Sequence, residues 1–228
     1  MKKRKSKILI YLIAVLITVY YVLRFTGAIG LSSNPTFANE PNIPIDSRII
    51  TSNLIEAKSG DFISYKFNDK YLGDHVRVHR LVGLENDTIE IKNGIVFLNN
   101  ENFDKNLNLV HYYKFSIDHL KEMYQFLPDY AFTTIKKIDS ISLKVLLEDF
   151  KKPSLKFKTT KVLEENFMID KEIQSIYKKP WNKDNFGPII IPKGKVFVLG
   201  DNRDFTFDSR NVGFIDKKDI KNVVFKVF

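Results

Sequence analysis

The sequence of 228 residues contains no cysteine. This absence excludes disulfide bonds, catalytic thiols and zinc sites built from thiolates. Acidic residues are missing from positions 1–31, which carry six lysines and arginines. Because the formal net charge of the chain is +9, the remaining residues carry only 9 − 6 = +3. This excess of positive charge is small, and the sequence has neither zinc-finger spacing nor a basic recognition helix. We therefore predict that nucleic acid is not a partner.

A long apolar run follows the first basic residues. Residues 8–23 contain no charge, and with Arg24 snorkelling the stretch extends to Leu31. Its length approaches the roughly 20 apolar residues that a membrane-spanning helix needs, and the cations before it favour a cytoplasmic N-terminus. We therefore predict a cytoplasmic segment at residues 1–7, a transmembrane anchor at residues 8–31, and an extracytoplasmic remainder.

A cleaved secretory signal is the alternative interpretation of the same run. Thr26-Gly27-Ala28 offers the small residues of a cleavage site. The apolar core is slightly long for such a signal, and Arg24 lies close to the proposed cut. These two features favour the anchor.

Two blocks of the chain have the pattern of β-strands. Apolar and polar residues alternate with period two, and an Asn-Gly pair at positions 93–94 marks a hairpin turn. The expected strands lie at residues 62–67, 76–82, 88–91 and 95–98, followed by a strand pair over residues 189–199 around Pro192-Lys193-Gly194. A last strand at 223–228 would close a sheet edge. The fold class is therefore predicted as mainly β, an antiparallel domain built from residues 32–100 and 186–228.

Residues 101–185 differ in character from these two blocks. We expect a helix capped by Ser116 and ended by Pro128, a second from Asp139 or Ser140 to about residue 150, and a third over residues 164–177. The segment is predicted to be an α-rich insertion, an α/β cap on the β domain. Either it simply covers the domain, or it is a docking surface for a substrate or a partner protein.

Three polar segments could contribute to a catalytic site. They are Ser32-Ser33-Asn34-Pro35-Thr36, the strand residue His79, and the loop from Gly200 to Gly213. Each has an ordinary structural interpretation: a turn before proline, a structural histidine, and a surface loop held by Asx-turns and ion pairs. The loop lacks the spacing of an EF-hand, so we predict no metal and no cofactor.

Together the three segments resemble the bacterial type I signal peptidases, which are membrane-bound serine proteases of the S26 family. That family carries Ser-Met-x-Pro-Thr after its anchor, a Lys-Arg-Val-x-Gly-Leu-x-Gly-Asp strand, and a Gly-Asp-Asn-x-x-x-Ser-x-Asp-Ser-Arg-x-x-Gly loop. This chain has residues 32–36 in the first position and residues 79–87 in the second. The third motif matches at Gly200, Asp201, Asn202, Asp208, Ser209, Arg210 and Gly213, with Thr206 for the usual serine.

The resemblance implies that Ser32 is the acylated nucleophile and that His79 stands in place of the lysine base. A lysine must be buried to bring its pKa down from about 10.4, whereas a histidine starts near 6.5. The signal peptidases of the endoplasmic reticulum and of archaea are similar in pairing serine with histidine. The chain departs from the family at Ser33, where methionine is usual, and at Gly30, where some relatives carry a second oxyanion donor.

Supporting roles follow from the same resemblance. Asp208 would orient the base or pair with Arg210, and Thr206 would hydrogen-bond the base. Asp201 and Asn202 would hold the loop.

The implied function is removal of N-terminal signal peptides from exported proteins through an acyl-enzyme. The expected location is the bacterial cell membrane, and the expected partners are signal-peptide-bearing preproteins, the lipid bilayer and, as a further candidate, the protein translocation machinery. A catalytically silent homologue that acts as an accessory or scaffold remains an alternative, because methionine and lysine are both replaced. A self-cleaving repressor with a related β fold would need a DNA-binding helix-turn-helix, and the sequence shows none.

Overall fold

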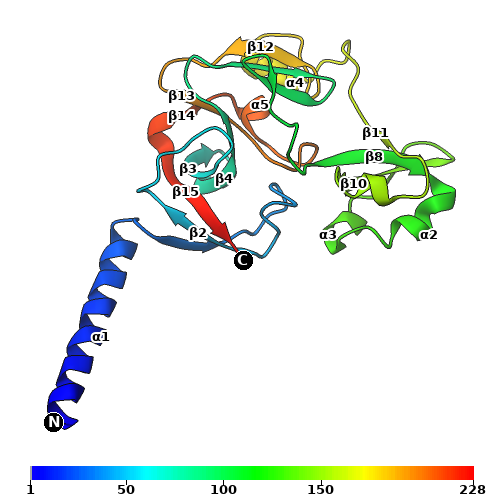
Figure 1. The fold of residues 1–228 in the computed structure, drawn as a ribbon. Helices are drawn as coiled ribbons and strands as arrows, with labels where there is room; N and C mark the ends of the chain where they lie inside the picture. The colour runs from blue at the N-terminus through cyan, green and yellow to red at the C-terminus, as the bar shows by residue number, and fades with distance from the viewer. Residues whose placement is uncertain (1) are drawn as a thin grey trace.

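The apolar N-terminal stretch is helical. The computed structural model describes residues 2–228, and helix α1 (Lys2–Phe25) projects away from the rest of the molecule (Figure 1). Among the described residues, this is the one helix long and apolar enough to cross a membrane, judged by length and composition over residues 7–25. None of that window is buried against the rest of the protein.

The helix ends earlier than the predicted anchor boundary at Leu31. The hydroxyl of Thr26 donates to a carbonyl of the last helical turn at 2.8 Å, and Gly27 has a positive φ of 74°. A residue with positive φ is a common helix terminator, and glycine adopts this conformation without strain. The helical part of the predicted segment 8–31 therefore stops at Phe25, and a strand follows.

The main sheet has seven strands in the order β1-β2-β15-β3-β4-β13-β14, and every neighbouring pair is antiparallel. The C-terminal strand lies inside this sheet, so the prediction that it closes an edge is wrong. The strands of the main sheet, in chain order, are β1 (Gly30–Ser33), β2 (Arg48–Ser52), β3 (Phe62–Asp69), β4 (Gly73–Gly83), β13 (Lys195–Leu199), β14 (Ile215–Asp216) and β15 (Ile220–Val227).

A second sheet has four strands in the order β12-β5-β6-β7. The predicted hairpin is present in it, and Asn93 and Gly94 at its turn have φ values of 50° and 73°. Ile173 of helix α4 is fully buried in the core of this sheet. Its elements are β5 (Thr88–Lys92), β6 (Ile95–Leu98), β7 (Glu101–Asn102), β12 (Phe186–Ile190) and α4 (Lys171–Tyr177). Fold class is thus mainly β and antiparallel, as predicted.

The segment between the two β blocks is built mainly from strands, so the prediction of an α-rich insertion is wrong. Its core is a four-stranded sheet in the order β11-β8-β10-β9, which we call the cap sheet (Figure 1). Only short helices accompany it. Its elements are β8 (Val110–Ser116), α2 (Leu120–Met123), α3 (Asp129–Phe132), β9 (Lys136–Lys137), β10 (Ser142–Glu148), β11 (Thr160–Lys161), and 3₁₀ turns at Ile117–His119 and Lys152–Ser154.

The predicted helices differ from the observed ones for identifiable reasons. Residues 142–148 form strand β10 because both of its faces are buried: Leu143, Val145 and Leu147 pack in one cluster and Leu146 in another. Apolar residues on both faces hide the period-two pattern of a strand. Ser116 does cap a helical turn, as predicted, but the helix that follows is short.

The third predicted helix, over residues 164–177, begins only at Lys171. The side chain of Asp170 accepts hydrogen bonds from the backbone N–H groups of Glu172 and Ile173, at 2.8 and 3.1 Å, and so forms its N-cap.

Candidate active site

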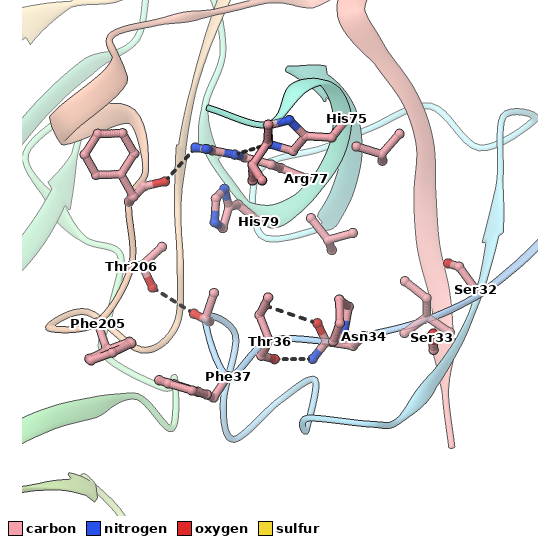
Figure 2. Close-up of a pocket in the computed structure, with 17 residues that line it drawn as sticks. Ser32, Ser33, Asn34, Thr36, Phe37, His75, Arg77, His79, Phe205 and Thr206 are labelled. Atoms are coloured by element: carbon pink, nitrogen blue, oxygen red, sulfur yellow. Dashed lines mark hydrogen bonds between the residues drawn. The ribbon is translucent and has the colours of Figure 1, made fainter. Parts of the chain in front are cut away.

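One pocket of about 680 Å³ brings the sequence-predicted segments together. Its walls come from the chain that follows α1, from strand β4 and from the loop after β13 (Figure 2). Ser32, His79 and Thr206 all contribute to these walls. Apolar side chains form much of the remainder, among them Ile49, Val76, Val78, Phe37 and Phe205. Such a mixture of apolar walls and a few polar groups is typical of a binding site.

Ser32 lies on an open edge of the main sheet. It is exposed in strand β1, opposite Ile49 of β2, and its hydroxyl forms no hydrogen bond with any described residue. Just beyond it, the buried side chain of Asn34 donates to the carbonyl oxygens of Thr36, Ile43 and Pro44, at 2.7 to 2.9 Å. Asn34 therefore shapes the turn after the serine, a role that the sequence analysis missed.

A side chain at position 30 would collide with Thr51 as that residue now lies. A Cβ atom at Gly30 would come within 2.3 Å of the Thr51 hydroxyl oxygen. The Thr51 hydroxyl in turn accepts a hydrogen bond from Asn222 at 3.0 Å. A second oxyanion donor carried by residue 30 would therefore require the Thr51 side chain to move.

His79 is held inside the sheet by strand β4. Only 4% of its surface is exposed, and its Nδ1 atom lies 2.7 Å from the hydroxyl of Tyr65 on β3. Burial lowers the pKa of His79 to about 4, although the negative charge of Asp208 opposes the shift. The imidazole is thus neutral at physiological pH, which is the state that a general base requires.

Ser32 and His79 do not contact each other. Strands β2, β15 and β3 lie between β1 and β4 in the sheet order, and Figure 2 shows the two side chains at opposite sides of the pocket. No hydrogen bond joins them in the described structure. Ser32 and His79 therefore line the same pocket, but they do not form a hydrogen-bonded catalytic pair.

Asp208 is the centre of a buried polar cluster in the loop from Gly200 to Gly213. Its carboxylate accepts two hydrogen bonds from the guanidinium of Arg210, both at 2.9 Å. It also accepts from the backbone N–H groups of Arg210 and Gly200, at 3.1 and 3.2 Å, and caps helix α5 (Ser209–Val212). The negative charge of Asp208 raises the pKa of His79, but the carboxylate forms no hydrogen bond with the imidazole among the described residues.

Asp201 joins the loop to the strand that carries the histidine. Its two carboxylate oxygens accept from the guanidinium of Arg80 at 2.7 and 2.5 Å, and Arg80 directly follows His79 in β4. The side chain of Asp201 is fully buried and that of Arg80 is 10% exposed. This ion pair fixes β4 against the loop.

Asn202 and Thr206 hold the chain that follows the serine. The side chain of Asn202 donates to the carbonyl of Phe37 at 3.1 Å, and its backbone N–H donates to that of Ala38 at 3.0 Å. The Thr206 hydroxyl lies 3.0 Å from the Ala38 carbonyl and 2.6 Å from that of Asn202. Thr206 therefore contacts the loop backbone rather than His79 in this structure.

The cap sheet also contacts this loop directly. The backbone N–H of Val110 in β8 donates to the carbonyl of Asp201, and its carbonyl accepts from the N–H of Arg203, both at 3.0 Å. Tyr130 of α3 stacks on Phe37 with ring centroids 5.7 Å apart. The cap thus supports both the polar loop and one apolar wall of the pocket.

Comparisons with known proteins identify a family. Residues 4–228 match the family model described as signal peptidase, peptidase S26. Signal peptidase I P of Bacillus subtilis subsp. natto is 27% identical over 235 residues, which cover 100% of this chain and 92% of that protein. Signal peptidase I of Bacillus licheniformis is 60% identical over 35 residues, 15% of this chain and 19% of that protein.

A crystal structure of a signal peptidase I from Enterococcus faecalis V583 aligns with a TM-score of 0.34 and 16% identity, over 74% of this chain and 97% of that one. Signal peptidase I of Aquifex aeolicus is 24% identical over 237 residues, which cover 100% of this chain and 84% of that protein. Because the family model extends over nearly the whole sequence, the chain belongs to the S26 signal peptidase family.

Proposed function

We propose that this protein is a membrane-anchored serine endopeptidase that removes N-terminal signal peptides from exported preproteins. The observation that carries the proposal is that Ser32, His79 and Thr206, one residue from each family segment, line the same pocket. Family membership supports the reaction class.

In the proposed reaction His79 takes the proton of the Ser32 hydroxyl, and the serine oxygen attacks the scissile carbonyl. The protonated imidazole then gives its proton to the leaving amine, which breaks the peptide bond and leaves an acyl-enzyme. Water hydrolyses the acyl group in the second half of the cycle. Since the two side chains are apart at rest, substrate binding must bring them within hydrogen-bond reach.

The geometry around Ser32 suits an extended peptide. Among residues 2–228, strand β1 pairs only with β2, so its other edge offers free backbone groups to which a substrate strand can be added. The neighbouring walls formed by Ile49, Val76 and Val78 are apolar. These walls fit the small side chains that signal peptides present near the cleavage point.

The proposed topology places α1 across the bacterial cell membrane with its basic end in the cytoplasm. The helix then holds Ser32 close to the membrane surface, because β1 begins soon after the helix ends. Preproteins emerging from the translocation machinery would meet the serine there, so the anchor contributes positioning as well as attachment.

Cleavage of a purified preprotein by the full chain in detergent or vesicles tests the proposal. We expect Ser32→Ala to reduce the rate by a factor of about 10⁴ or more, as removal of a serine nucleophile does elsewhere. We expect His79→Ala and His79→Gln to reduce it strongly as well. Ser140→Ala and His119→Ala, exposed and half-exposed residues of the cap, are the matched controls. Unchanged cleavage by the Ser32 and His79 variants would disprove the proposed pair.

A catalytically silent homologue is the second candidate, and one observation favours it. Ser32 and His79 form no hydrogen bond and lie on opposite sides of the pocket. A silent homologue would bind signal-peptide segments without cleaving them. An activated peptide ester that acylates Ser32 in the wild-type chain but not in Ser32→Ala would rule this candidate out.

A further inference from the structure

Tyr65 faces His79 from the neighbouring strand. Strands β3 and β4 are antiparallel, with Ile63 opposite His79 and Tyr65 opposite Arg77, so Tyr65 and His79 are diagonal neighbours. The tyrosine ring is completely buried, and its centroid lies 5.9 Å from that of the imidazole. The 2.7 Å separation between its hydroxyl and Nδ1 is that of a good hydrogen bond.

The direction of this hydrogen bond follows from the possible partners of each group. Within residues 2–228 the Tyr65 hydroxyl has no partner other than Nδ1 of His79. If Nδ1 carried the proton, the buried hydroxyl proton would have no acceptor, which costs about 1–3 kcal/mol. If instead the hydroxyl donates to Nδ1, both groups are satisfied. The second arrangement places the imidazole proton on Nε2.

We propose that Tyr65 is a positioning residue that holds His79 at rest in the tautomer with its proton on Nε2. This inference rests on the proposed role of His79 as the base. In that tautomer Nε2 is a hydrogen-bond donor and cannot accept the proton of Ser32. The resting site is therefore held in an inactive protonation pattern, in agreement with the separation of Ser32 from His79.

Activation requires one rearrangement of protons. Water in the pocket accepts the proton that leaves Nε2, and a proton carried by water is added at Nδ1, so that the imidazole stays neutral. The Tyr65 hydroxyl turns its own proton away and accepts from Nδ1 instead. Nε2 then has a free electron pair for the proton of Ser32. The Tyr65 hydroxyl can accept from Nδ1 in this state, but its own proton then has no acceptor among residues 2–228, and this cost favours the resting tautomer.

Nitrogen NMR of the full chain in detergent micelles, with its histidines labelled with nitrogen-15, tests the inference. The signals of His79 are assigned by their loss in His79→Gln. We expect wild-type His79 at pH 7 to show a protonated Nε2 and an unprotonated Nδ1. We expect Tyr65→Phe to shift the Nδ1 signal, because its donor is lost, and to raise the share of the opposite tautomer. Tyr113→Phe, a buried tyrosine of the cap that donates to Asp149 at 2.8 Å, is the control and should leave both signals unchanged.

Two outcomes would overturn the inference: a proton on Nδ1 in the wild-type chain, or His79 signals that Tyr65→Phe leaves unmoved. The wild-type spectrum decides the first point even if the variant does not fold. A parallel cleavage assay separates this inference from the proposed function. Absent cleavage with the proton on Nε2 contradicts only the peptidase, whereas cleavage with the proton on Nδ1 contradicts only the role of Tyr65.

Discussion

His79 is set apart from an ordinary strand histidine by its surroundings. It is buried, its Nδ1 is paired with Tyr65, and three charged side chains act on it. Burial is the largest effect and lowers its pKa, Asp208 raises it, and Arg77 and Arg210 lower it further. The result is an imidazole that resists protonation, the opposite of a surface histidine that pairs with a carboxylate.

This environment predicts that kcat/KM falls on the acid side only at a lower pH than for an ordinary histidine base. A base with a pKa of about 4 is neutral over most of the working range and becomes protonated, and so inactive, only as the pH falls through that value. We expect kcat/KM for a preprotein to stay level from neutral pH to about one unit above that pKa, then to halve near it. An acid limb near pH 6.5, the ordinary histidine value, would contradict this expectation.

At the scale of elements, the loop from Gly200 to Gly213 and strand β4 form one buried polar unit. Two ion pairs, Arg80 with Asp201 and Arg210 with Asp208, lie almost completely out of solvent. A buried charge without its partner is costly, so the members of each pair depend on each other. The loop is accordingly a rigid support for the pocket, and Thr206 and Asn202 extend that support to the chain after Ser32.

Replacing Asp208 by asparagine tests this unit. Arg210 would keep its charge in a buried place without a carboxylate, so we expect the free energy of unfolding to fall by about 3–5 kcal/mol. Denaturant unfolding of the full chain in detergent measures the loss. Asp216→Asn, which breaks the exposed pair with Lys195, is the control and should change stability little. A loss no larger than that of the control would contradict the interpretation.

The cap sheet shows why a strand that is buried on both faces can be predicted as a helix from the sequence. Residues 142–148 fall within the helix that the sequence predicts from a cap at Asp139 or Ser140 to about residue 150. The structure uses those residues in β10, between β8 and β9. Burial on each side comes from partners far away in sequence, such as Tyr113 and Phe115 on one side and Tyr112 on the other.

At the scale of the whole molecule, α1 stands outside the folded body. None of its membrane-length window is buried by the rest of the chain, so the body does not stabilise that apolar surface. An apolar helix of this length needs a non-aqueous environment along its whole circumference.

Removal of residues 2–25 is therefore expected to release the protein from membranes. The full chain should stay in the pellet after alkaline extraction of membranes, whereas the shortened chain should appear in the supernatant. Protease added to intact spheroplasts should degrade the body but leave a protected fragment if the N-terminus is cytoplasmic. A full chain that is extracted by alkali would contradict the anchor.

The sequence alone determined the features that depend on local patterns. The length of an apolar run indicated α1, the period-two alternation and the Asn-Gly turn indicated the β class, and short motifs at a characteristic spacing indicated the family. Such patterns can be read because each involves residues that are close in the chain.

Only the tertiary structure decided which groups meet. It placed Tyr65 against His79, paired Asp208 with Arg210, directed Thr206 to the backbone after the serine, and left Ser32 across the pocket from the histidine. Each of these contacts depends on strand register or on packing between distant segments. A shift of one residue in register would turn the Tyr65 side chain to the other face of the sheet, which is why the sequence by itself could not show the partner of His79.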